Sequence, residues 1–360
     1  MEHLDVTVHL AFAFDIGYEI DLERARPLLP GESGAVPRRR RTPESIRYRP
    51  APLRAAVSAD GIALPGAIVP VGPPRAELTL FDFGAVSLTV QFPLRIAAGA
   101  LIGLAGELSD IGPLNASARR AIAPWIERIR PVVLGYEFSE ISEEYVVFQM
   151  GDARAGWLES HTDWIAGLVR LESGPLSRTE IAEATRLSLS YAPNDLVTLD
   201  WAAGFVADRD CGDTLQVIEF ANVQLLEFRH IDDRLDDRLE AAYRLIRPAG
   251  RESGLRSLWR SHSDALRNVR ELEIEATSLF ERADNALKLI GDQYLSRVFD
   301  LASSRFHLRD WQQSIRRKLD TVGDVYDLLV QQSGGSRMEF LEVIVVVLIA
   351  LEILLALFRH

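Results

Sequence analysis

One segment constrains the fold of this chain more than any other. From Phe340 to Phe358 the sequence reads FLEVIVVVLIALEILLALF, in which only Glu342 and Glu352 are charged. A helix of this length extends about 28 Å, close to the roughly 30 Å of a bilayer's hydrocarbon core. The segment therefore predicts one C-terminal transmembrane helix within residues 338–360, which follows a flexible Ser/Gly joint at residues 333–337.

The alternative interpretation is a buried or coiled-coil helix of an oligomer, because the stretch without a charge spans only Val343–Leu351. A charged carboxylate near the middle of a bilayer is costly. We therefore expect Glu352 to be neutral, bonded to its own backbone, or paired with a neighbouring helix, which predicts a homo-oligomer or a partner membrane protein. Glu342 lies near the edge of the segment and can reach the interface.

We expect no cleavable export or organelle signal at the opposite end. Met1–Asp5 is acidic and has neither an apolar segment nor an arginine-rich amphipathic helix. We therefore expect a single-pass protein of the cell membrane, with its large N-terminal part in the cytoplasm and the lipid bilayer as partner of the C-terminal helix.

The distribution of proline divides the chain. Ten of the 17 prolines lie between Pro27 and Pro74, and none follows Pro248, so long helices are possible in the later part. The predicted fold class is an α+β N-terminal domain, then a long antiparallel helical bundle or stalk, then one transmembrane helix. The domain is placed at residues 1–210, with a Pro/Arg-rich loop at 30–75, and the coiled-coil-like stalk at 212–332.

Hydrophobic periodicity predicts the elements of the first domain. Strands are expected over Val6–Phe12, Ala76–Phe83, Ala85–Phe92, Glu144–Met150 and Val197–Val206, and helices over Leu94–Leu108, Ala116–Ile129, Ala153–Leu171 and Ser177–Ser190. Ser177 and Glu180 form an S-x-x-E capping box. Gly99, Gly103 and Gly106 lack nucleotide-binding spacing, and close helix packing is the interpretation we give them.

Signatures of enzymes are missing from the sequence. It contains no phosphate-binding loop, HExxH, GxSxG or CxxC motif. The seven histidines include no pair at helical ligand spacing, and the single Cys211 follows two aspartates that disfavour a thiolate. Aspartates at 232, 233, 236 and 237 alternate with arginines, which is typical of a salt-bridged surface. No catalytic, cofactor-binding or metal-binding residue is predicted, and no cofactor.

One basic run could contact a partner. Arg38, Arg39, Arg40 and Arg41 form a possible basic surface patch, in a solvated loop or against anionic lipid headgroups. Nucleic acid is the other candidate for this run, but only Tyr48 offers a nearby stacking ring. The net charge of −12 also argues against it. We expect no nucleic-acid partner.

Several short stretches resemble a known family. They are Gly291–Leu295, Trp311, Lys318–Leu319, Tyr326, Leu341–Glu342 and Ile349–Leu354, and more loosely Leu80–Gly84, Glu144–Phe148 and Glu219–Glu227. Together they resemble the "required for meiotic nuclear division" family, also called YagE-like or domain of unknown function 155. The resemblance implies a cytoplasm- or matrix-facing domain with a C-terminal membrane helix. It also implies a link of mitochondrial relatives to organellar translation, and it supplies no catalytic residues.

Three functions remain open on the sequence. A scaffold or tether that presents a cytoplasmic domain to a partner complex is the leading hypothesis. An oligomeric ion channel or transporter similar to CorA-type channels is the alternative, although the Gly-Met-Asn motif and a second membrane helix are missing from the sequence. An enzyme of unrecognised type is the third.

Overall fold

The computed structural model describes residues 3–30, 51–66, 68–151, 156–246, 274, 277 and 293–324. The chain divides into two compact units. The first unit takes in the chain as far as His230 and a later stretch that ends at Gln312, and the second begins at Ile231 and again at Gln313. Each is described by itself.

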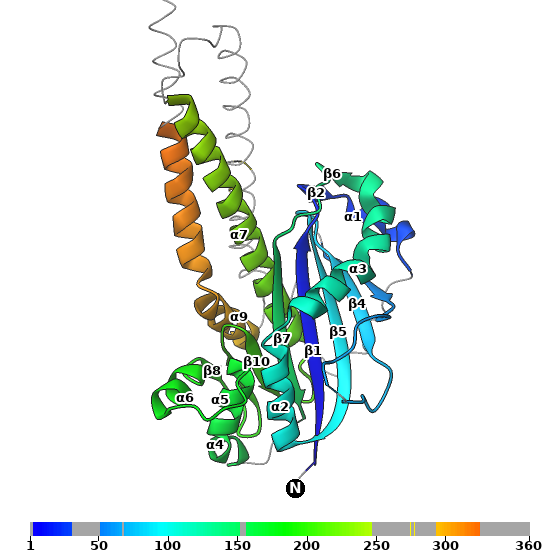
Figure 1. The fold of residues 1–360 in the computed structure, drawn as a ribbon, viewed down its shortest axis with the longest axis vertical. Coiled ribbons are helices and arrows are strands. Elements are labelled where there is room, and N and C mark those ends of the chain that lie inside the picture. Colours follow the sequence, from blue (N-terminus) through cyan, green and yellow to red (C-terminus); the bar gives the residue numbers. More distant parts are fainter. Residues whose placement is uncertain are drawn as a thin grey trace, which may run out of the picture. The chain divides into compact units, whose positions relative to one another are not determined.

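An eight-stranded sheet forms the centre of the first unit (Figure 1), in the order β3-β4-β5-β1-β7-β10-β9-β8. Neighbouring strands are antiparallel, except that β7 and β10 are parallel. The strands are β1 (His3–Asp15), β3 (Leu53–Val57), β4 (Arg75–Leu80), β5 (Ala85–Ala97), β7 (Ser142–Met150), β8 (Ser188–Leu189), β9 (Leu196–Leu199) and β10 (Ala203–Ala207). A separate small sheet pairs β2 (Glu19–Ile20) with β6 (Val133–Leu134).

The sheet is covered on both faces, which explains its long apolar strands. On β1, alternate residues Val8, Leu10, Phe12 and Phe14 are fully buried in the main apolar cluster. The intervening residues, among them His9, are buried as well. The strand pairs with β5 along its whole length, from His3 opposite Ala97 to Asp15 opposite Ala85.

Helices cover the two faces with different chemistry. The apolar cluster contains residues of α2 (Ala98–Leu108), α3 (Gly112–Ile129) and α5 (Thr162–Arg170). On the other face, α7 (Gly212–Ile246) buries several polar side chains against the strands. The remaining helices are α1 (Leu22–Ala25), α4 (Trp157–Ser160), α6 (Arg178–Ala184), α9 (Gln293–Arg305) and a helix over 308–324, with 3-10 turns at Arg26–Leu28 and Arg130–Val132.

The β4–β5 turn depends on glycine. Gly84 has φ +96°, and a Cβ atom there would lie 1.6 Å from the carbonyl oxygen of Gly17. The backbone of the turn therefore approaches the chain that follows β1 more closely than any side chain would allow.

Most predicted elements are confirmed with shifted ends. The strand expected over Val197–Val206 is the hairpin β9–β10, because a turn at 200–202 interrupts it. The helix expected from Leu94 begins at Ala98, since β5 continues through Ala97. The capping box is confirmed at one of its bonds, because the Ser177 Oγ accepts from the Glu180 amide at 3.2 Å.

Close helix packing, our interpretation of the three glycines of α2, is confirmed for Gly106 alone. A Cβ at Gly106 would lie 2.9 Å from the Ser173 side chain. Nothing lies within 4 Å of a Cβ at Gly99 or Gly103, so that interpretation is wrong for these two.

The predicted fold class is wrong. The structure has a large mixed sheet, and the first part of α7 is a covering layer of that sheet, where the prediction placed a stalk. Contrary to the predicted fold class, no helix in the described part of the chain is long and apolar enough to cross a membrane. The anchor predicted at 338–360 and the joint at 333–337 lie outside the described residues.

In the second unit, α7 continues from Ile231, and the chain over 313–324 is also helical. Lys318 Nζ lies 2.9 Å from Asp232 Oδ1 and 2.7 Å from Asp236 Oδ1. The acidic run on α7 thus has an ion-pair partner 82 positions later in the sequence (318 − 236). This agrees with a salt-bridged surface, although the partner is a lysine outside the run.

Candidate functional site

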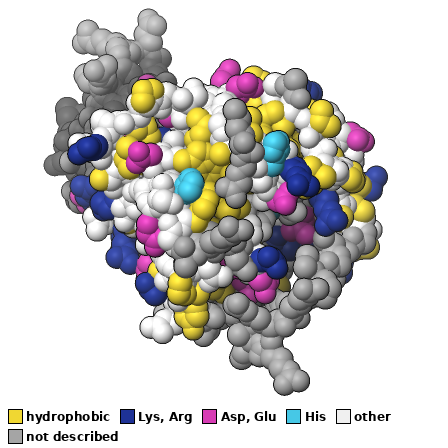
Figure 2. All heavy atoms as spheres, turned by 90° about the horizontal axis from the view of Figure 1, so that it is seen from below, with side chains coloured by type: hydrophobic (Ala, Val, Ile, Leu, Met, Phe, Trp, Pro, Cys, Tyr) yellow, Lys and Arg dark blue, Asp and Glu magenta, His cyan; other side chains and the backbone are white. Residues whose placement is uncertain are grey.

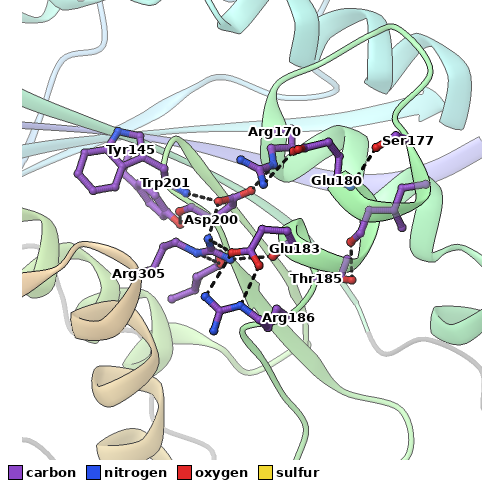
Figure 3. A network of polar contacts seen from close by, with 12 residues as sticks. Tyr145, Arg170, Ser177, Glu180, Glu183, Thr185, Arg186, Asp200, Trp201 and Arg305 are labelled. Atoms are coloured by element: carbon purple, nitrogen blue, oxygen red, sulfur yellow. Dashed lines mark hydrogen bonds and ion pairs between the residues drawn. The ribbon is translucent and has the colours of Figure 1, made fainter.

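A buried carboxylate organises one edge of the sheet (Figure 3). Asp200, which follows β9, is only 1% exposed. Its Oδ2 lies 2.8 Å from Arg170 Nε on α5, and its Oδ1 lies 3.1 Å from Arg305 Nη1 on α9. The Trp201 amide donates to Oδ1 at 2.7 Å. A buried charge needs such partners, because desolvation would otherwise destabilise the fold.

Arg305 joins segments that are far apart in sequence. Its Nε donates to the Leu199 carbonyl at 3.1 Å, and its Nη2 donates to the Glu183 carbonyl at 3.1 Å. The Tyr145 hydroxyl donates to the Asp200 carbonyl at 2.9 Å, and the ring of Tyr145 meets that of Phe306 edge-on. One guanidinium, that of Arg305, therefore bonds helix α9 both to the β9–β10 hairpin and to α6.

An open groove of about 650 Å³ lies beside this network. Its lining carries charges of both signs, which form exposed ion pairs. Arg186 Nε is 3.0 Å from Glu183 Oε2, and Arg309 Nη2 is 3.6 Å from Asp300 Oδ1. Hydrogen bonding to Arg186 lowers the pKa of Glu183. The ionisable residues of the lining are Glu183, Arg186, Asp300, Arg305, His307, Arg309 and Asp310.

An aromatic pair borders the groove. Trp201 is 50% exposed, and its ring centre lies 6.3 Å from that of His307. His307 has φ +53°, an uncommon conformation for a residue with a side chain. It separates α9 from the helix that begins at 308. The groove therefore combines ion pairs that can exchange partners with an accessible ring.

A second polar cluster lies between the sheet and α7. Glu219 Oε2 is 2.8 Å from Arg54 Nη2, and Arg54 Nη1 is 2.6 Å from Glu77 Oε1. Burial opposes the charge of Arg54, but Glu219 and Glu77 together raise its pKa. Hydroxyls of Thr79 and Thr89 donate to Glu219 Oε1 at 3.1 and 3.4 Å. Every charge in this cluster thus has a direct partner.

A cavity of about 30 Å³ adjoins this cluster. Among its lining residues are His9, Thr89, Tyr145, Glu219 and Asn222. His9 Nε2 is 3.0 Å from Gln149 Oε1, and burial lowers the pKa of His9.

The structure also brings a serine, a histidine and an aspartate together. Ser139 Oγ is 3.3 Å from His230 Nδ1, and His230 Nε2 is 3.6 Å from Asp15 Oδ1. The order resembles a nucleophilic triad, but Ser139 is 8% exposed and its Oγ accepts the Ile141 amide. A nucleophile must reach its substrate, so we interpret this contact as one that attaches α7 to β1.

Burial raises the pKa of two further side chains, Glu143 and Cys211. The pKa of Glu143 is raised to about 7, although the neighbouring Arg229 opposes the shift. The pKa of Cys211 is raised to about 12 by burial and by Asp208. This agrees with the expectation that Cys211 is no nucleophile.

The residues predicted as sites lie elsewhere in the chain. Glu342, Glu352 and the run Arg38, Arg39, Arg40 and Arg41 fall outside the described residues. Within the described ranges, no group of three or more histidine, cysteine or acidic side chains could hold a metal ion. Sequence reasoning missed Asp200 and Arg305, because their sequence separation gives no signal that they meet.

Viewed from below (Figure 2), side chains of the two charge signs are interspersed around a central group of apolar ones. This face shows no continuous area of basic charge. The expectation of no nucleic-acid partner stays a prediction.

Comparisons with known proteins give a family but no activity. The family described as "Uncharacterized protein MJ0711, N-terminal domain" matches residues 5–214, which is more than half of the chain. The uncharacterised protein MJ0711 of Methanocaldococcus jannaschii is 24% identical over 226 residues, 62% of this chain and 68% of that protein. No solved structure matches the chain. The resemblance to the meiotic nuclear division family stays a prediction.

Proposed function

We propose that this chain, which belongs to the family of the MJ0711 N-terminal domain, is a scaffold that binds a segment of a partner polypeptide. The proposed binding site is the groove beside Asp200. The family's description states no activity, so the proposal rests on the site. The carrying observation is the groove of about 650 Å³, lined by charges of both signs and bordered by the exposed ring of Trp201. No specific observation on the described residues favours the channel or the enzyme alternative.

The chemistry of the groove favours a polypeptide that carries both acidic and basic side chains. Arg186 and Glu183 are 61% and 44% exposed, and Arg309 and Asp300 are 78% and 56% exposed. Solvent-exposed ion pairs contribute little to folding, so these side chains can change partners at small cost. Trp201 adds an aromatic anchor of the kind enriched at binding hot spots.

Site-specific photo-crosslinking tests the proposal. A benzophenone amino acid replaces Arg309 in the groove in one variant. In the matched control it replaces Arg95, which is 69% exposed on β5, away from the groove lining. After irradiation in cells, we expect one defined polypeptide attached at position 309 and not at position 95, identified by mass spectrometry.

A charge-reversal variant tests whether ion pairs in the groove select the partner. Combining Arg186→Glu with the crosslinker at 309 should abolish the adduct if ion pairs select the partner. Identical adducts at positions 309 and 95, or an adduct that Arg186→Glu leaves unchanged, would show that the groove is not the binding site.

A further inference from the structure

The cavity under α7 is lined by a histidine nitrogen that lacks a donor and by the carboxylate of Glu219. The Gln149 Nε2 donates to the Asp208 carbonyl at 3.3 Å, which fixes the orientation of the amide. Its Oε1 then faces His9 Nε2 at 3.0 Å, so this nitrogen must carry the hydrogen. In the neutral ring His9 Nδ1 is therefore an acceptor, and it has no partner among the described residues although His9 is 95% buried.

The side-chain donors around the cavity bond to acceptors elsewhere, apart from the second hydrogen of the Asn222 amide. The Thr89 hydroxyl donates to Glu219, and the Tyr145 hydroxyl donates to the Asp200 carbonyl. The Asn222 amide nitrogen donates to the Glu143 carbonyl at 3.4 Å. His9 Nδ1 therefore remains without a donor, and a buried acceptor of this kind needs one. Glu219 lines the same cavity and already accepts from Arg54, Thr79 and Thr89.

The charge of the adjoining cluster and the size of the cavity limit which molecules can occupy it. Glu219 and Glu77 share the one cation Arg54, so the adjoining cluster carries a net charge of −1 when all three are ionised. A volume of about 30 Å³ holds about one or two water-sized molecules. We propose that this cavity is a buried binding site for a small hydrogen-bond donor, filled by water or by an ammonium ion, that bridges His9 Nδ1 and Glu219. This site is independent of the groove.

Two isosteric variants of Ala11, which lines the cavity, provide the test. Ala11→Thr and Ala11→Val add side chains of nearly the same shape to the full-length protein, and only threonine brings a donor. If the occupant donates to the two acceptors, threonine can replace it and valine cannot. We expect the melting temperature of Ala11→Thr to exceed that of Ala11→Val by about 2–4 °C.

A matched pair at Ala55 controls for the substitution itself. Ala55 is 1% exposed within the apolar cluster on β3, so Ala55→Val should melt above Ala55→Thr. Because each comparison is between isosteres, crowding cancels. If Ala11→Val melts at or above Ala11→Thr, the cavity is dry and the proposal fails.

Ammonium chloride and sodium chloride at equal ionic strength separate the two occupants. A rise in the melting temperature with ammonium alone, present in the wild type and lost in Ala11→Thr, identifies ammonium as the donor. The same temperature in both salts, together with the Thr-over-Val order, identifies water.

Discussion

At the scale of single residues, the polar contacts of Asp200 matter most for the stability of the fold. Its carboxylate is almost fully buried and has Arg170 and Arg305 on its two oxygens. Because Arg305 also donates to two carbonyls on separate segments, no shorter side chain can replace all of its bonds.

Removing this guanidinium should therefore be costly. For Arg305→Ala we expect a loss of about 3–5 kcal/mol in the free energy of unfolding, measured by urea denaturation of the full-length protein. The exposed Arg309→Ala should change it by less than about 0.5 kcal/mol. Equal effects of the two variants would contradict the structural role given to Arg305.

Glu143 gives a pH dependence whose sign follows from burial. Its pKa rises from the usual 4.5 to about 7 in the folded protein, so the folded state holds a proton that the unfolded state releases. The free energy of unfolding should therefore fall as pH rises from about 4.5 to 7. Glu143→Gln should remove this part of the slope in denaturation curves across that range, and an unchanged slope would contradict the raised pKa.

Cys211 should be unreactive in the folded protein. It is 4% exposed, and its pKa of about 12 leaves almost no thiolate at pH 8. As this is the one cysteine of the sequence, intact mass after iodoacetamide treatment measures it directly. We expect one adduct in urea and none without it, whereas rapid native labelling would contradict the burial of the thiol.

At the scale of elements, the turn between β4 and β5 is the most constrained connection. Gly84→Ala places a Cβ 1.6 Å from a backbone oxygen at a positive φ, so the turn must move. We expect a loss of more than about 2 kcal/mol in the free energy of unfolding. Gly103→Ala on α2 is the matched control. It has open space around the new Cβ and should stabilise the helix by about 0.5–1 kcal/mol. A neutral Gly84→Ala would contradict the close approach.

Local patterns predicted the elements better than their assembly. Alternation identified β1 and the two strands around Gly84, and the Ser177 cap was readable because its partner lies three residues away. The covering role of α7 was missed because its buried face includes Glu219, Asn222 and Gln224. Polar residues at those positions imitate a solvated stalk helix. Only the sheet's side chains explain why Glu219 is buried, because Arg54, Thr79 and Thr89 donate to it.

For the whole molecule, the matched family region ends at 214, close to the start of α7. The segment after it supplies the second cover of the sheet, with Val217, Ile218 and Phe220 buried. A chain that ends at Asp210 loses this cover and α9. We expect it to bind a hydrophobic dye and to unfold without a cooperative transition. A chain that ends at Asp324 should unfold cooperatively, and similar behaviour of the two truncations would contradict the role of α7.

The central position of β1 sets the order in which the protein can be assembled on the ribosome. This strand is synthesised first, yet its two neighbours are β5, which ends at Ala97, and β7, which ends at Met150. The hairpin of β4 and β5 can form as soon as it emerges, while the apolar first strand stays without its β7 neighbour until about 150 residues have been translated. The nascent chain therefore keeps one apolar strand with an unpaired edge until β7 has been made, and an unpaired edge of this kind favours aggregation during folding.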